Sequence, residues 1–445
     1  MCVMKLNKYF MMGAMGLSLV ACSDNLDENG QGANGTNPNE GTTYVAFTVD
    51  FKGTESRVVD ESGTASERNV TSAYVLLVDN GTISSVVSKD DVVASGEGYH
   101  STEDKYLFQT TEGNHSFYAV INPTGDIPAE GESIAEYFGT AVSLAVDNGV
   151  AAANNFMMSS TEEVVANVQD NITEDEALTG TDETKNNFKV VVERVAAKVT
   201  VSAENATITD SKTDDGDASG QISGTTFDLW NGAEKTYRMA QPTYIVDNTF
   251  GYYKKGTSVY MGAYNADDVT PAYCLENLHA TSEYKQGNTT YINISTTFTP
   301  SKVVDCADEI KPLKDNSTKG TFYVVTRGEL SNNYIMDADL QKYRTDKSDQ
   351  SILPAGVEAL SAPYTDGKCW FGPIWVGQEK QGEDSYAPVA RNTWYALQIK
   401  SISLPGDPEE PEIKDPEWPL EPPTNVAITL EVKKWTLKPI NVDLN

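Results

Sequence analysis

The sequence predicts an all-β fold built from β-sandwiches, and two observations lead to it. Short runs in which apolar and polar residues alternate recur along the chain, and turn residues separate them at regular intervals. The chain also has the apolar content for packed cores, with 39% hydrophobic residues, 22 Tyr and 13 Phe. Its 445 residues suffice for two or three domains, and we place a boundary near residue 205.

The chain opens with a leader that carries export signals. Lys5 and Lys8 precede an apolar run that is too short to span a bilayer, so residues 1–21 predict a signal peptide. The run ends in Leu19-Val20-Ala21-Cys22, a lipobox pattern that predicts lipidation of Cys22. Membrane attachment would then rest on this cysteine, and more than one acyl chain would make it stable.

One strand follows a polar spacer, at residues 43–52. Its apolar residues share one face, which the period of two predicts to be buried: Val45, Phe47, Val49 and Phe51. Arg57 comes directly afterwards as a candidate protease site, and Arg68 is the alternative beyond a second polar loop. A lone strand between a lipid anchor and a protease site makes sense if it is removed, so residues 22–57 read as a lipidated propeptide.

The body of the chain continues in β segments. The expected strands are 73–78, 116–121, 188–195, 198–202, 257–261, 289–297, 321–326, 369–376 and 392–402. Ala196-Ala197 is read as a break in a long strand, and residues 134–146 predict a short helix. Residues 170–187 and 210–220 read as solvated acidic loops. The second lacks the end ligands of a calcium loop, because Ser211 and Ile222 hold those positions.

Charge and cysteine content exclude several function classes. With 33 Lys+Arg against 65 Asp+Glu, the formal charge is −32, which argues against a nucleic-acid partner. The spacing of Cys274, Cys306 and Cys369 matches no zinc site, and we expect these cysteines to be buried small side chains. A single disulfide between two of them is the alternative.

Candidate catalytic and sugar-binding residues are few. The three histidines, His100, His115 and His279, lie in no catalytic pattern, so we expect no enzyme, no catalytic residue, no metal and no cofactor. The aromatic run Trp370-Phe371 with Trp375 could stack a sugar, but buried strand aromatics are the favoured reading.

The C-terminal part changes in character. Residues 405–423 hold seven Pro and seven acidic residues, which predicts an extended, stiff, self-repelling linker. Residues 425–445 alternate again, in three phases: Ile428, Leu430 and Val432, then Trp435 and Leu437, then Ile440, Val442 and Leu444. Because chain ends are normally polar, an apolar alternating terminus predicts a strand that fills a groove.

Several of these stretches, in this order, resemble the fimbrillins of type V pili, which are found in Bacteroidales. The resemblance is carried by the lipobox, the strand before Arg57, Val192-Glu-Arg-Val-Ala-Ala-Lys-Val199, Tyr273-Cys-Leu-Glu-Asn277, Gly287-Asn-Thr-Thr-Tyr-Ile292, Ala390-Arg-Asn-Thr-Trp-Tyr395 and the tail from Val432. It implies two tandem transthyretin-like β-sandwiches, an N-terminal domain over 58–205 and a C-terminal domain over 206–445.

The resemblance also implies how the subunit assembles. The precursor would be an outer-membrane lipoprotein, and an arginine-specific protease would cut after Arg57 and release the leader with its first strand. The tail of a neighbouring copy, or of another fimbrial subunit, would then fill the groove with the donor-strand residues Trp435, Leu437, Ile440, Val442 and Leu444. Repetition would build a fimbria on the cell surface that supports adhesion. Val58 departs from the Ala or Thr that often follows the arginine in this family.

Two other functions remain open from the sequence. One is an accessory fimbrillin at the tip or at the anchor, although an anchor needs no arginine site and a tip needs no free tail. The other is a glycan-binding surface lipoprotein, which gives no reason for an apolar alternating C-terminus.

Overall fold

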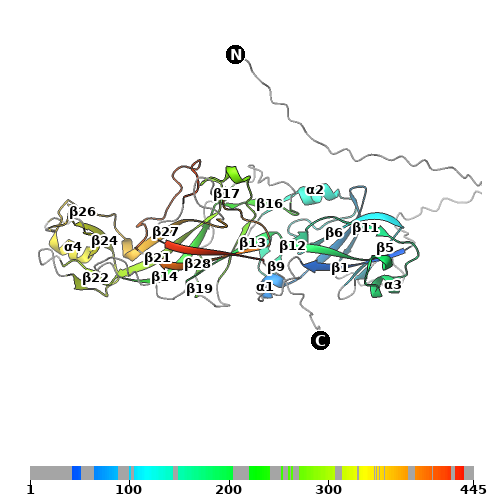
Figure 1. Ribbon diagram of the computed structural model, residues 1–445, viewed down its shortest axis with the longest axis horizontal. Coiled ribbons are helices and arrows are strands. Elements are labelled where there is room, and N and C mark those ends of the chain that lie inside the picture. The colour runs from blue at the N-terminus through cyan, green and yellow to red at the C-terminus, as the bar shows by residue number, and fades with distance from the viewer. Residues whose placement is uncertain are drawn as a thin grey trace, which may run out of the picture. The chain divides into compact units, whose positions relative to one another are not determined.

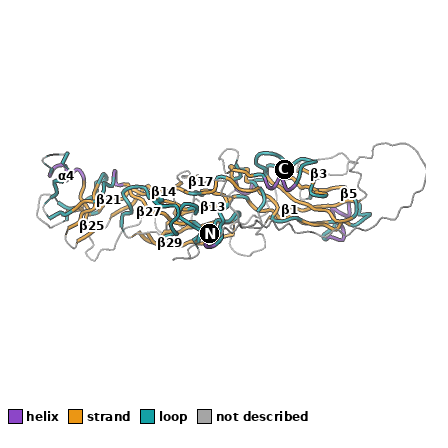
Figure 2. Tube along the Cα trace, turned by 90° about the horizontal axis from the view of Figure 1, so that it is seen from above, coloured by secondary structure: helices purple, strands orange, loops and turns teal. Residues whose placement is uncertain are grey.

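The computed structural model is dominated by strands, with short helices between them (Figure 1; Figure 2). It describes residues 43–51, 65–88, 100–101, 105–143, 149–203, 220–240, 252–253, 259–260, 262–263, 270–305, 313–327, 330–344, 346, 348–349, 351–354, 356–378, 386–402, 404–421 and 426–434. The predicted all-β fold class is confirmed.

The N-terminal part of the chain forms a nine-stranded sheet. Its strand order is β3 (Thr82–Ser88), β2 (Ala73–Asp79), β6 (Gly113–Ile121), β10 (Met158–Ser160), β12 (Asn187–Arg194), β1 (Thr43–Phe51), β5 (Tyr106–Thr110) and β4 (His100–Ser101), with β11 (Val164–Val168) paired to β6. The sheet curls, since β3 near one end also lies against β4 and β5. One face of the curled sheet encloses a core to which β1 contributes Val45 and Phe47.

Local signals explain two features of this sheet. β2 and β3 form a hairpin through Asn80 and Gly81, whose φ angles of 51° and 77° are the left-handed values that a two-residue I′ turn requires. The prediction of a helix over residues 134–146 is wrong for the second half of that range. α2 (Ile134–Gly139) ends at Gly139, and β7 (Ala141–Ser143) follows, paired with β16 (Lys235–Tyr237).

The chain passes from one sheet to the next at Val195. β12 belongs to the nine-stranded sheet, whereas β13 (Ala196–Ala203) belongs to the second sheet. Ala196 and Ala197, read from the sequence as a strand break, are the first residues of β13 and pair with β20 (Ala272–Leu275). The change of sheet thus comes before residue 205, where the sequence placed a domain boundary.

Two further sheets form a sandwich. One has the order β19 (Gly262–Ala263), β13, β28 (Thr393–Ile402) and β29 (Val426–Lys434), with β20 paired to β13; the other has the order β18 (Val259–Tyr260), β14 (Gly220–Trp230), β21 (Tyr291–Pro300) and β27 (Lys368–Trp375). Their facing residues form one core, which includes Val199 and Leu397 from the first sheet and Phe227 and Ile294 from the second. Cys274 and Cys369 lie buried in this core as free thiols, and Cys306 lies outside the described residues.

Smaller elements complete the described chain. They are the sheet β25 (Leu330–Met336), β24 (Phe322–Arg327) and β26 (Ala359–Leu360); the pairs β15 (Gly232–Ala233) with β17 (Tyr252–Tyr253), β22 (Lys302–Val303) with β23 (Lys314–Asp315), and β8 (Ala151–Ala152) with β9 (Asn155–Phe156); the helices α1 (Ala65–Arg68), α3 (Glu174–Thr179) and α4 (Asp337–Tyr343); and the 3-10 turns η1 (Glu183–Lys185), η2 (Thr281–Glu283) and η3 (Thr365–Gly367).

The proline-rich acidic segment packs against the sandwich over its described part, residues 404–421. Asp407 and Trp370 exchange backbone hydrogen bonds of 2.7 and 2.9 Å, and the Gly287 amide donates to the Pro416 carbonyl at 2.9 Å. The sequence predicted a self-repelling linker from charge and proline content. These contacts instead tie the segment to β27 and to the turn before β21.

Candidate functional site

The strand β1 lies inside its sheet, with a hydrogen-bonded neighbour on each side. It runs parallel to β12, pairing Ala46 with Asn187 at one end and Phe51 with Val192 at the other. On its second side it runs antiparallel to β5, where Thr43 pairs with Thr110. Figure 1 shows β1 beside β12 and β5. Removing β1 would therefore unpair two strand edges at once.

The inner face of β1 is part of the hydrophobic core. Val45 and Phe47 are fully buried, and Val49 packs partly buried against the same cluster. The Phe47 ring centroid lies 4.0 Å from that of Phe117, and Phe47 also contacts Phe108 and Phe188, at 6.1 and 5.6 Å. The side chain of Phe51, the fourth member of the predicted face, lies outside the described residues.

The outer face of β1 is also covered, which the sequence pattern did not predict. Ala46 is fully buried and packs with Leu107 of β5 and Ala177 of α3. Tyr44, Ile172 and Leu178 surround this small cluster as partly buried neighbours. The space above Ala46 is thus filled by α3, and the position suits a small side chain.

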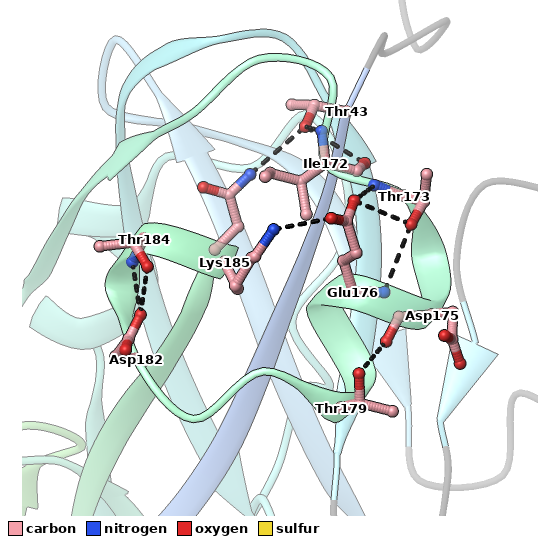
Figure 3. Close-up of polar contacts among 10 residues, drawn as sticks. Thr43, Ile172, Thr173, Asp175, Glu176, Thr179, Asp182, Thr184 and Lys185 are labelled. Carbon is pink, nitrogen blue, oxygen red and sulfur yellow. Dashed lines mark hydrogen bonds and ion pairs between the residues drawn. The ribbon is translucent and has the colours of Figure 1, made fainter.

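The segment that covers β1 is residues 169–187, which we call the clasp. Backbone hydrogen bonds join it to β1, from the Tyr44 amide to the Ile172 carbonyl at 3.0 Å and from the Ala46 amide to the Asn186 carbonyl at 2.9 Å. The Thr43 hydroxyl donates to the Gln169 carbonyl at 2.8 Å and accepts from the Ile172 amide at 3.0 Å. Figure 3 shows Thr43 beside Ile172 at the edge of the clasp.

Asn186 is the centre of the contact between the clasp and β1. It is fully buried and has a left-handed backbone, with φ of 53°. Its side-chain amide donates to the Tyr44 carbonyl at 3.0 Å and to the Thr43 hydroxyl at 3.3 Å, while its oxygen accepts from the Gln169 amide at 2.7 Å. One buried side chain therefore holds both the clasp and the first residues of β1.

The prediction of a solvated acidic loop is right for the acidic side chains, since Glu174, Asp175 and Glu183 are exposed, but wrong for the backbone, which forms α3 and η1. Thr173 and Glu176 form a reciprocal capping box at the start of α3, and Lys185 Nζ lies 2.6 Å from Glu176 Oε1 (Figure 3). The hydrogen bonds from Lys185 and Thr173 lower the pKa of Glu176 to about 2. Hydrogen bonds from Thr184 likewise lower the pKa of Asp182.

The segment between the two predicted processing sites, Arg57 and Arg68, is anchored by a buried ion pair. Glu67 of α1 is fully buried, and its carboxylate lies 2.9 Å from Lys198 Nζ. The Tyr273 hydroxyl donates to Glu67 at 2.6 Å, and the Lys198 ammonium lies 4.6 Å from the ring centroid of Trp394. Burial, followed by the charge of Glu67, raises the pKa of Tyr273. The alternative site Arg68 ends α1, whereas Arg57 lies outside the described residues.

The C-terminal segment is described only as far as Lys434. β29 is the last strand of its sheet and pairs antiparallel with β28, with Leu430 opposite Leu397. The donor-strand residues expected from the sequence lie outside the described residues: Trp435, Leu437, Ile440, Val442 and Leu444. The predicted lipidation residue, Cys22, does as well. Within the described ranges, no helix is long and apolar enough to cross a bilayer.

The remaining sequence candidates have structural roles. Phe371 and Trp375 are 2% exposed, which favours the core reading over a sugar-stacking surface, whereas Trp370 is partly exposed. His115 Nδ1 lies 2.7 Å from Asp79 Oδ1, and the His279 ring contacts the Asn288 carbonyl at 3.1 Å. Burial lowers the pKa of His279. The side chain of His100 lies outside the described residues.

Comparison with known proteins finds one family match, in the C-terminal part, and similar solved structures that cover most of the chain. Residues 362–440 match the family described as "Major fimbrial subunit protein type IV, Fimbrillin, C-terminal". Among solved structures, a fimbrilin (fimA) from Porphyromonas gingivalis is similar, with 16% identity over 89% of this chain and 99% of that chain and a TM-score of 0.49. The tip fimbrial protein Mfa3 from the same organism has 14% identity over 88% of this chain and 100% of that chain, with a TM-score of 0.40.

Proposed function

From its place among the fimbrillins, carried by residues 362–440, we propose that the chain is a structural subunit of a cell-surface fimbria. The subunit is exported as an outer-membrane lipoprotein anchored at Cys22. An arginine-specific protease then removes residues 22–57 with β1. The C-terminal segment of another copy, or of another fimbrial subunit, takes the vacated place, and the resulting filament supports adhesion.

The single structural observation that supports strand exchange is the position of β1. It precedes Arg57 in the chain, yet it lies between two hydrogen-bonded strands and supplies core side chains. Burial of Val45 and Phe47 alone is worth about 3–6 kcal/mol. A groove that has lost this much apolar contact, together with two rows of backbone partners, favours capture of another strand. Head-to-tail capture generates an open fibre.

The ion pair at Glu67 favours Arg57 over Arg68 as the processing residue. A cut after Arg68 would remove Glu67 and leave the ammonium of Lys198 buried without this carboxylate. Breaking a buried ion pair in this way costs about 3–5 kcal/mol. A cut after Arg57 keeps Glu67 in the mature chain and leaves the anchor of its new N-terminal region in place.

The proposal is tested with two matched variants, Arg57→Ala and Arg68→Ala, treated with an arginine-specific protease. We expect Arg57→Ala to keep its leader and to remain monomeric, and Arg68→Ala to be processed and to form fibres, as seen by electron microscopy and by the mass of the product. Normal fibres from Arg57→Ala would show that this bond is not the one that matters. An absence of fibres from the fully processed parent protein would contradict strand exchange itself.

A further inference from the structure

The segment that begins just before β29 resembles β1 in sequence. β1 reads Thr43-Tyr-Val-Ala-Phe-Thr-Val-Asp-Phe51, and residues 424–432 read Thr-Asn-Val-Ala-Ile-Thr-Leu-Glu-Val. Four of the nine positions are identical, and the acidic and apolar positions also correspond. We infer that residues 424–432 of one copy replace β1 in the next copy, in the same direction and with Thr424 in the place of Thr43.

This inference rests on the proposed function and names the occupant and the register of the groove. Alternation alone would not identify the occupant, because many strands of the chain alternate. The identifying position is Ala46, which is fully buried under Ala177 of the clasp and beside Leu107. Ala427 is the residue that the match brings to this place.

The last eleven residues fit the same place less well. Residues 435–445 contain no Ala, Gly or Ser. With their apolar residues turned toward the core, they would bring a Thr, Lys, Asn or Asp to the position of Ala46. Each of these side chains is larger than Ala, and overfilling a closely packed site is unfavourable.

The clasp also recognises the other end of the matched segment. In β1, the Thr43 hydroxyl contacts Asn186, the Ile172 amide and the Gln169 carbonyl. Thr424 supplies the same hydroxyl one residue before Asn425, whose carbonyl would take the place of the Tyr44 carbonyl on Asn186. The buried polar groups of the clasp would thus be satisfied again, which an unmatched strand would not achieve.

Residues 424–432 would gain a neighbouring strand by moving from their own sheet to the place of β1 in the next copy. In its own fold, β29 is the last strand of its sheet and pairs with β28. At the place of β1 the segment would pair with β12 on one side and β5 on the other. Transfer therefore adds a second row of backbone hydrogen bonds.

The differences between the two segments explain why β1 must be cut away first. Ile428 corresponds to Phe47, whose ring contacts three other phenylalanines, and Val432 corresponds to Phe51. Ile428 fills the space of the Phe47 ring less completely than phenylalanine does. While β1 is still attached, it therefore outcompetes the incoming strand for the groove. Strand exchange can occur only after the protease has removed β1.

Disulfide trapping tests the register directly. Gln109 is the antiparallel partner of Tyr44, so the inference places Asn425 of the incoming copy opposite Gln109. In a Cys306→Ser background, we expect processed Gln109→Cys/Asn425→Cys protein to give disulfide-linked ladders that disappear on reduction. The matched control, Gln109→Cys/Asn441→Cys, should give none. Ladders from the control and none from Asn425→Cys would overturn the inference and leave the proposed function standing.

A second measurement tests the small-residue position. We expect Ala427→Leu to slow fibre elongation by about tenfold or more, because the added volume meets Ala177 and Leu107. Thr436→Leu places the same leucine side chain outside the matched segment and should leave the rate within about twofold. Equal rates for Ala427→Leu and the parent protein would overturn the inference. If the processed parent protein forms no fibres, the proposed function fails first, and this inference fails with it.

Discussion

A Phe47→Ala variant tests the proposed removal of β1, because it should destabilise the protein before processing and not after it. Phe47 is fully buried, and its ring contacts Phe117, Phe108 and Phe188 at centroid distances of 4.0, 6.1 and 5.6 Å. Truncation of such a side chain typically costs about 3–5 kcal/mol. Since a whole domain is stable by only about 5–15 kcal/mol, Phe47→Ala should remove a large part of the precursor domain's free energy of unfolding.

The assay is denaturant unfolding of unprocessed and processed protein, each as parent and variant. Phe47→Ala should lower the free energy of unfolding of the unprocessed protein by about 3–5 kcal/mol and leave the processed protein unchanged, because residue 47 has left with the leader. Phe188→Ala is the matched control. Phe188 packs in the same core from β12, so its truncation should destabilise both forms.

Two results would refute this reasoning. A loss below about 1 kcal/mol in the unprocessed protein would mean that β1 does not hold the core together. An equal loss in the processed protein would mean that β1 stays in the subunit after cleavage.

Two further predictions concern the anchor and the clasp. Glu67→Gln should lower the free energy of unfolding by about 3–5 kcal/mol in both forms, and adding Lys198→Met should recover most of that loss in a double-mutant cycle. Hydrogen bonds from Lys185 and Thr173 hold the pKa of Glu176 at about 2 in the folded protein, below its ordinary value of 4.5, so their stabilising effect is complete above pH 4.5 and is lost as the pH falls toward 2. Glu176→Gln should therefore lower the melting temperature at pH 7 but not near pH 2, and an equal shift at both values would contradict the assigned cause.

Local chemistry made much of the fold predictable. Alternation indicated β1, and Asn80-Gly81 is a turn signal at the place where β2 joins β3, although no strand was predicted directly after it. The partners of β1 were not predictable, because Ala46 pairs with Asn187 far along the chain and no local signal states which strands meet. Composition also misled: the proline-rich segment has the charges of a free linker, yet backbone groups such as those of Asp407 bind it to the sandwich.

The clasp shows what composition hides at the candidate site. Its acidic residues correctly indicated exposure to solvent but not the helix: Thr173 and Glu176 stand three apart in the spacing of a capping box, which is a signal for a helix. Asn186 left a weaker signal, because asparagine tolerates a left-handed backbone wherever it occurs. That this asparagine would hold the first residues of β1 depends on long-range packing, which the sequence does not display.

β1 pairs parallel with β12 and antiparallel with β5, so the groove that it occupies has a defined direction. Parallel and antiparallel ladders place their hydrogen bonds differently. A donor strand inserted in the opposite direction would therefore have mismatched hydrogen-bonding groups along both β12 and β5. A polymer joined through such grooves has every unit facing the same way. Its two extremities would then be chemically distinct, one offering an empty groove and the other an unused strand.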